Sequence, residues 1–284
     1  MTRRNRKQLW CLIVGITLVF TAAAWADPAE DAYKEGLRLA EKGILKQARD
    51  EFDKAIRLKP TYAEAFSARG NVRNRLMQNT LALEDFDEAI RLNPSYKEAY
   101  YNRANVYMDM GQRDKAVQDY TAAIKLNPSH AEAFYNRGLA YIMLGRGEAA
   151  ADARSYLELK GWRDERSLYI VLIGYAGYLY GRQNDEAQKL IEEAKTKVNT
   201  AAWPYPIVRY FLHESSLPEL LEAATDNDKQ TEARAYAGME LSLSGKRDEA
   251  LAHLKWVREN GNKGFIEYTF AAAELERIEP TAAN

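Results

Sequence analysis

The chain has 284 residues, of which 29% are charged and 46% are hydrophobic, and its formal net charge is −1. This composition is typical of a globular protein with room for one extended array or two small domains, and it has no basic excess that would indicate nucleic acid binding. Because it has three histidines and one cysteine, Cys11, we expect no Cys/His metal site and no cofactor.

The first predicted element is a secretory signal peptide over residues 1–26. The chain opens with four basic residues, continues with an apolar run from Leu9 to Phe20, and then has the small-residue cleavage pattern Ala24-Trp25-Ala26. We therefore expect cleavage after Ala26, a periplasmic or secreted chain, and no stable membrane insertion afterwards. The alternative is an uncleaved segment that tethers the chain to a membrane, although this run is shorter than the roughly 20 residues that span a bilayer.

The next part of the chain repeats itself every 34 residues. The pattern Glu-Ala-(Phe/Tyr)-x-x-Arg-(Gly/Ala) begins at Glu64, Glu98 and Glu132. Self-similarity at this period is typical of a solenoid of helix hairpins. In the second unit we expect one helix from Ala63 to about Met77 and its antiparallel partner from Leu81 to about Leu92.

Prolines and glycines predict where these helices end. Proline cannot continue a helical hydrogen-bond ladder, and the residue before it avoids the helical region. The prolines that close three consecutive units are Pro60, Pro94 and Pro128. The glycines expected in the tight turn within a unit, where a positive φ is often needed, are Gly43, Gly111 and Gly145.

These recurring positions resemble the tetratricopeptide repeat family. In the third unit the matching residues are Tyr100, Ala104, Tyr107, Gly111, Ala116, Tyr120, Ala123 and Pro128. The resemblance covers about residues 29–162, and it implies an all-α solenoid of antiparallel helix hairpins that binds protein or peptide partners. The fourth unit departs from the pattern, because Arg154 and Leu157 replace the usual aromatic and small residues.

Beyond this array the period weakens and then returns. We predict five segments: a signal peptide over 1–26, an N-terminal array of about four repeats over 27–163, a divergent helical hairpin over 164–200, a Trp/Pro-containing insertion over 201–230, and a C-terminal repeat with a capping helix over 231–284. We expect the capping helix over Phe265–Ile278. Terminal units of solenoids need polar faces, so Glu274, Glu276 and Arg277 should face solvent.

The insertion over 201–230 breaks the repeat pattern. Its segment Trp203-Pro204-Tyr205-Pro206 cannot form the interior of a helix, and we expect two short helices around Ser215-Ser216, Ile207–Leu212 and Leu217–Ala224. We favour an insertion whose Trp203 and Tyr205 pack between two parts of the array, because buried aromatic residues are commoner than exposed ones. The alternative is a surface on which a partner docks.

The C-terminal third resembles a narrower bacterial family. The segments that carry this resemblance are Tyr210-Phe211-Leu212, Ala224-Thr225-Asp226-Asn227, and Glu259-Asn260-Gly261-Asn262 before Phe265-Ile266-Glu267-Tyr268. They are similar to the periplasmic tetratricopeptide adaptor lipoproteins of the new lipoprotein I type. The resemblance implies a homodimer that docks an envelope protease and its peptidoglycan hydrolase substrate. This sequence has no lipidation cysteine at the predicted cleavage site.

The inner face of the array is the predicted partner-binding site. In the tetratricopeptide family the first helix of each unit lines the concave side, and helical spacing places the fifth and ninth positions on one face. The residues that we expect in this concave groove are Tyr33, Asn71, Tyr101, Asn102, Asn105, Tyr135 and Asn136. Asparagine offers an extended backbone both a donor and an acceptor, and tyrosine adds contact area with a polar tip. The alternative is that these side chains are ordinary solvated residues.

No catalytic residues are predicted, and we expect the protein not to be an enzyme. Acidic residues such as Glu64, Glu98 and Glu132 recur with the repeat, and an active site would not be copied in every unit. The sequence instead favours a non-catalytic periplasmic or secreted adaptor or scaffold, presenting clients such as cell-envelope hydrolases to partners such as an envelope protease. The alternative is a structural scaffold of an envelope complex that acts through its outer faces and self-association.

Overall fold

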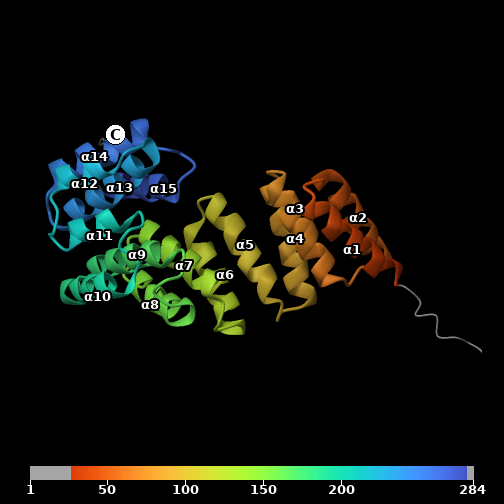
Figure 1. Cartoon of the computed structure of the whole chain (residues 1–284). Helices are drawn as coiled ribbons and strands as arrows, with labels where there is room; N and C mark the ends of the chain where they lie inside the picture. Colours follow the sequence, from red (N-terminus) through yellow and green to blue (C-terminus); the bar gives the residue numbers. More distant parts are fainter. Residues whose placement is uncertain (1–26, 280–284) are drawn as a thin grey trace, which may run out of the picture.

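The computed structural model describes residues 27–279, and over these residues its only regular secondary structure is helical (Figure 1). Fifteen α-helices follow one another along this part of the chain and pack largely as consecutive pairs, which confirms the predicted all-α solenoid of helix hairpins. The predicted signal peptide lies outside the described residues. Within residues 27–279, no helix combines the length and apolar character that crossing a bilayer requires.

The bounds of the helices in the N-terminal array are α1 Pro28–Glu41, α2 Leu45–Leu58, α3 Ala63–Arg75, α4 Asn79–Leu92, α5 Lys97–Asp109, α6 Arg113–Leu126, α7 Ala131–Met143 and α8 Ala149–Lys160. The later helices are α9 Ser167–Tyr180, α10 Asn184–Lys197, α11 Tyr205–Phe211, α12 Leu217–Ala223, α13 Asn227–Leu243, α14 Arg247–Asn260 and α15 Ile266–Ile278. The helices of the second unit therefore differ by two residues from the expected ends at Met77 and Leu81.

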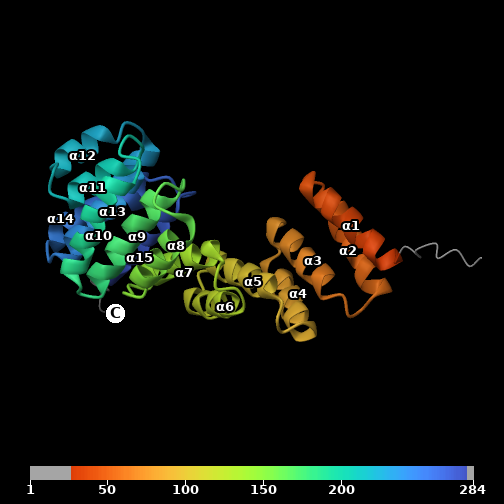
Figure 2. The same cartoon turned by 60° about the horizontal axis from the view of Figure 1, so that its bottom comes forward.

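The two halves of the molecule differ in how their helices are arranged. Hairpins α1–α2 to α7–α8 follow one another in a single row (Figure 1). In the C-terminal half the chain gathers into a thicker body, seen most clearly in the turned view (Figure 2). There α13 contacts α9, and the last helix, α15, contacts α13, α14 and α7. The final helix thus packs against α7, which lies much earlier in the sequence.

Small and aromatic residues fill the contact between the two helices of a unit. In the second unit Ala82, Phe86 and Ala89 are fully buried on α4. Gly70 on α3 allows the helices to approach, because a Cβ placed there would come within 2.9 Å of the Phe86 ring. The stripe of alanine and phenylalanine that marks the repeat in the sequence is therefore the core of each hairpin.

The fourth unit keeps this geometry with one residue fewer. Arg69 and Arg103 bind carboxylates 16 positions later in the chain, whereas Arg137 binds Asp152, only 15 positions later. The spacing between the motif arginine and its aspartate is therefore one residue shorter in the fourth unit. Ala149 and Ala153 take the buried positions on α8. Arg154 and Leu157 departed from the sequence pattern because the chain between α7 and α8 had changed length.

Arginines of the repeated motif connect neighbouring units. Arg69 on α3 donates to Asp85 of its own unit at 2.6 Å and to Asp53 of the preceding unit at 2.5 Å. The equivalent contacts are Arg103 with Asp119 and Asp87, and Arg137 with Asp152 and Thr121. Each arginine therefore joins three helices, which explains why it recurs with the period.

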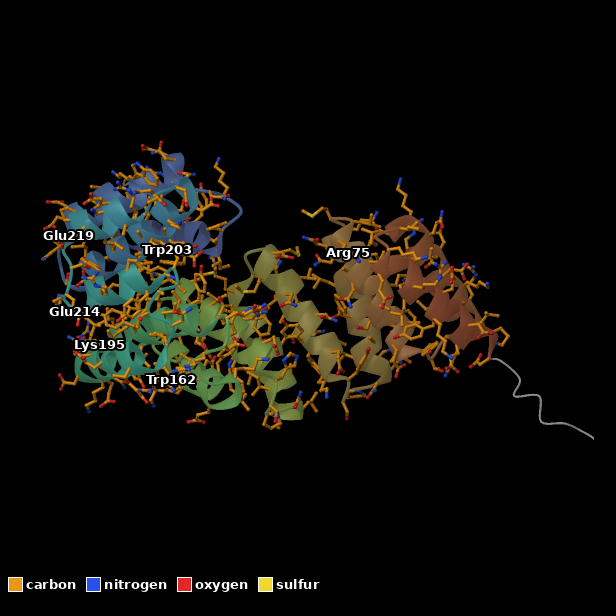
Figure 3. The ribbon with its side chains drawn as sticks, in the orientation of Figure 1. Arg75, Trp162, Lys195, Trp203, Glu214 and Glu219 are labelled. Carbon is orange, nitrogen blue, oxygen red and sulfur yellow. The ribbon has the colours of Figure 1, made fainter. Side chains whose placement is uncertain are left out.

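The insertion packs its aromatic residues inside the C-terminal half. Tyr205 is buried and Trp203 is half-buried, and Figure 3 shows Trp203 between the green and blue helices. Two short helices follow, α11 and α12, and the second begins with a capping box between Ser216 and Glu219. Helix α13 begins at Asn227, earlier than the predicted unit at Thr231, because the Asp226 side chain caps it by accepting from the Lys229 backbone N–H. The five-segment division stays a proposal.

The capping helix is held by a side chain that we expected to face solvent. Glu274 is only 2% exposed, so that expectation was wrong for this residue. Its carboxylate accepts hydrogen bonds from Tyr180 and Ser242, each at 2.6 Å, and pairs with Arg277. Arg277 also donates to the backbone carbonyls of Ile142 and Met143 at the end of α7. The carboxylate is buried because α15 packs between α13 and α7 rather than forming an open end.

Candidate functional site

Aromatic contacts along the first helices link successive units. The ring centroids of Tyr33 and Tyr62 are 5.0 Å apart, and those of Tyr101 and His130 are 4.6 Å apart. Tyr62 and His130 each come directly before the first helix of the following unit, at α3 and α7. Between these two contacts, Tyr96 precedes α5 and lies beside Ser67.

Sequence reasoning missed the position that Tyr62, Tyr96 and His130 share. These residues are 34 positions apart, so the signal was present in the repeat. Burial is the main cause that raises the pKa of Tyr62 and of Tyr96 to about 12. Both hydroxyls therefore stay protonated near neutral pH and can act as hydrogen-bond donors.

Three of the predicted groove residues form one hydrogen-bonded group. The Asn136 amide on α7 donates to the Tyr101 hydroxyl at 3.1 Å and to the Asn105 Oδ1 at 3.2 Å, both on α5. The buried Tyr120 hydroxyl also donates to the Asn105 Oδ1, at 2.6 Å. Asn105 therefore uses its carbonyl oxygen inside the protein, and it is the amide group that it can offer to a ligand.

The other predicted groove residues lie apart from this group. Asn71 is exposed on α3 and Asn102 is half-buried on α5. Tyr33 rests on Phe52, with ring centroids 5.8 Å apart. Tyr135 packs against Tyr156 at the same distance. The structure thus distributes the predicted residues over four successive units, and their role in binding stays a prediction.

A pocket of about 330 Å³ includes Tyr135 in its wall. It forms where α7, α9 and α13 meet the segment that leads into α15. Its lining residues are Tyr135, Arg166, Tyr169, Glu232, Gly264, Phe265, Ile266 and Glu267. Apart from Tyr135, sequence reasoning did not place these residues in a binding site, since they come from segments up to a hundred residues apart and share no motif.

Two buried glutamates stand in this pocket, and each is 4% exposed. The Trp203 indole N–H donates to Glu232 Oε2 at 2.7 Å, and the Tyr169 hydroxyl donates to Oε1 at 3.4 Å. Burial raises the pKa of Glu232 to about 7 despite these donors. Burial, followed by the charge of Glu232, raises the pKa of Glu267 to about 7.

The polar groups described above can donate and accept hydrogen bonds. Within residues 27–279 no group of three or more histidine, cysteine, aspartate or glutamate side chains could hold a metal ion. The described residues include the hydrogen-bonded Tyr101, Asn105 and Asn136 and a pocket lined by two carboxyl groups. Those groups can hydrogen-bond a polypeptide backbone and its polar side chains.

Comparison with known sequences identifies the repeat. Residues 78–111 and 104–145 match the profile of the TPR repeat, the tetratricopeptide unit. A curated relative, the lipoprotein NlpI homolog of Haemophilus influenzae, is 31% identical over 125 residues. That match covers 41% of this chain and 40% of the relative, so less than half of either protein is aligned.

Solved structures share the fold. A tetratricopeptide repeat protein from Parabacteroides merdae has a TM-score of 0.56 at 18% identity, covering 87% of this chain and 99% of its own. YrrB, described as a TPR protein with an unusual peptide-binding site, has a TM-score of 0.54 at 19% identity, covering 66% of this chain and 93% of its own. A MamA structure gives 0.52 at 21% identity, covering 59% and 90%. At these identities the similarity shows the fold alone.

Proposed function

Because this chain is a tetratricopeptide repeat protein and a distant homologue of lipoprotein NlpI, we propose that it is a non-catalytic adaptor that binds protein segments in its concave groove. The repeat profile belongs to a helical fold that typically binds other proteins and carries no reaction centre. The observation that supports the groove most directly is the Tyr101–Asn105–Asn136 group, in which predicted groove residues of two neighbouring units are hydrogen-bonded to one another.

The place of action that we propose is the cell envelope. The basic and apolar start of the sequence favours export across a membrane, and the curated relative is named as a lipoprotein. The clients would be cell-envelope hydrolases, handed to a partner such as an envelope protease. A preformed groove helps such binding because few side chains must be ordered when the client arrives. The resemblance also suggests a homodimer, which light scattering of the purified chain would measure.

Affinity capture from envelope extract of the source organism tests the groove. The wild-type chain is compared with the Asn71→Ala/Asn136→Ala variant. These two residues are chosen because Asn105 supports the buried Tyr120 hydroxyl, so its loss would also disturb the fold. The matched control is Gln118→Ala/Lys125→Ala, which changes two exposed residues on the second helix α6. Captured proteins are identified by mass spectrometry.

We expect the wild type and the control to capture an envelope protease or a cell-wall hydrolase, and the groove variant to lose it. If all three proteins capture the same set, the groove is not the binding site. If none captures a partner and the chain self-associates, the structural scaffold acting through its outer faces replaces the adaptor as the leading hypothesis.

A further inference from the structure

The pocket lined by Tyr135, Tyr169, Glu232, Phe265 and Glu267 combines aromatic rings with two buried carboxyl groups. We call it the acidic aromatic pocket. It contains two carboxyl groups that are almost fully buried, and burying a charge is costly unless it is paired. Within the described residues, neither glutamate forms an ion pair with a lysine or arginine.

In the described part of the chain, the charged groups around the two glutamates leave both carboxyl groups without an ion pair, and Lys229, the cation nearest the start of α13, is itself paired with Asp226 at 2.8 Å. Asp226 and Asp228, at the start of α13, both raise the pKa of Glu232. Tyr135 on α7, Tyr169 on α9 and Tyr236 on α13 face the pair with hydroxyl groups that stay neutral near pH 7. The cation in the lining is Arg166. The pocket therefore favours a positively charged occupant.

The aromatic walls favour the same occupant. Tyr135, Tyr169 and Phe265 supply rings around the pocket, and aromatic faces attract ammonium and guanidinium groups. The Tyr135 ring already has a guanidinium over it, because the Arg166 Cζ lies 5.5 Å from its centroid. A second cation between these walls would lie in the pocket that both carboxyl groups also line.

We propose that the acidic aromatic pocket binds the ammonium or guanidinium group of a lysine or arginine side chain belonging to the segment in the groove. This inference rests on the proposed function, because the pocket shares Tyr135 with the predicted groove and would anchor one side chain of a bound segment. A cation would offset the burial of the two carboxylates, and each partner would then be hydrogen-bonded and paired. The free amine at the N-terminus of a peptide offers the same chemistry, so the test must separate these two sources.

The experiment selects binders from a displayed library of random 12-residue peptides, using the full chain as the target at pH 8. Each selected peptide is resynthesised both with a free and with an acetylated N-terminus, and the affinities of both forms are measured by calorimetry. The same measurements are made on Glu232→Gln/Glu267→Gln, which keeps the shape of both side chains and removes their charge. The matched control is Glu192→Gln/Glu222→Gln, which changes two exposed glutamates.

We expect the selected peptides to share a lysine or arginine at one position. Their affinity should fall about tenfold or more in the Glu232→Gln/Glu267→Gln variant, remain unchanged in the control, and weaken from pH 8 to pH 6 as the carboxyl groups take up protons. Circular dichroism confirms that each variant is folded.

Each of the other possible outcomes leads to a different conclusion. If peptides bind the wild type and the double variant equally, or share no basic residue, the pocket proposal is overturned and the adaptor function stands. If affinity is lost only on acetylation, the occupant is a terminal amine, and the side-chain proposal is wrong. If no peptide is selected, both the groove function and the pocket proposal are overturned.

Discussion

At the scale of single residues, one turn of the array departs from its own repeat. The turns at Gly43, Gly111 and Gly145 all have a positive φ, between 66° and 74°. Met77 occupies the equivalent position with a φ of 61° and a side chain that is 83% exposed. A left-handed conformation costs a residue with a Cβ about 1–2 kcal/mol, so this turn is strained without any visible packing gain.

We therefore predict that Met77→Gly increases the free energy of unfolding by about 1 kcal/mol, because glycine adopts this conformation without a steric cost. Urea denaturation followed by circular dichroism measures the change. Gly111→Ala serves as the converse control and should destabilise the chain by a similar amount. A Met77→Gly protein less stable than wild type would show that the exposed methionine makes a contact that offsets its strained backbone.

The repeated arginines give a second prediction at this scale. Arg103 donates to Asp119 at 2.6 and 2.7 Å and to Asp87 at 2.5 Å, and the side chains of Arg103 and Asp119 are 18% and 9% exposed. Arg103→Leu leaves a carboxylate without its partner in a buried position, and we expect a loss of about 3 kcal/mol.

The matched control for this prediction is Arg91→Leu. Arg91 pairs with Glu88 on the surface of α4, and its side chain is 67% exposed, so we expect a change within about 0.5 kcal/mol. Denaturation midpoints of the two variants should differ clearly. If they shift equally, the contacts between units contribute no more than a surface ion pair.

Sequence patterns predicted many of these residues but not their partners. The motif arginine and the aspartates both recur every 34 residues, yet the period alone does not show that Arg69 reaches into the preceding unit as well as its own. The asparagines of the predicted groove were placed by their helical positions. That Asn105 and Asn136 bind each other could not be predicted, because the contact depends on the distance between neighbouring units.

At the scale of helices, α15 determines how the C-terminal half is held together. Glu274 on this helix accepts from Tyr180 on α9 and from Ser242 on α13, and it also pairs with Arg277. We predict that Glu274→Ala lowers the free energy of unfolding of the C-terminal half by about 3 kcal/mol, because buried polar partners lose their acceptor. Hydrogen exchange should show faster exchange in α13, α15 and the end of α7.

The neighbouring residue Glu276 is the matched control, because it lies exposed on the same helix. Glu276→Ala should leave exchange rates in α13 and α7 unchanged. If Glu274→Ala behaves in the same way, α15 is held by its apolar contacts alone, and the buried carboxylate has no structural role.

The helices themselves were largely predictable from sequence, but their long-range packing was not. In the second unit, proline and the apolar stripe predicted the ends of both helices to within two residues. The repeat pattern did not predict the one-residue shift in the fourth unit. Gly145 still matches the 34-residue period, whereas the residues of α8 do not. The repeat pattern did not predict the burial of Glu274 either, because its partners Tyr180 and Ser242 lie in helices that are distant in the sequence.

At the scale of the whole molecule, the two buried glutamates make stability depend on pH. Burial raises the pKa of both Glu232 and Glu267 from 4.5 to about 7. Between these pH values the folded chain binds more protons than the unfolded chain, so the free energy of unfolding falls as pH rises. We expect this loss to be complete about one pH unit above pH 7 and to be on the order of 3 kcal/mol for each carboxyl group.

The Glu232→Gln/Glu267→Gln variant should have a flatter profile of unfolding free energy between pH 5 and pH 8, and it should be more stable than wild type at pH 8. Urea denaturation at a series of pH values measures both effects, and Glu192→Gln/Glu222→Gln should keep the wild-type slope. Parallel profiles for wild type and the first variant would mean that these carboxyl groups ionise normally in the folded chain.

The contact between Arg277 and the last carbonyls of α7 has an evolutionary consequence. In the N-terminal row each hairpin touches its neighbours, so a duplicated 34-residue unit inserted after Pro94 would lengthen the row and leave its contacts intact. A duplication anywhere between Met143 and Arg277 would move α15 away from α7 and break the hydrogen bonds between Arg277 and the last carbonyls of α7. Lineages of this protein are therefore expected to vary in repeat number before α7 and to keep the count fixed after it.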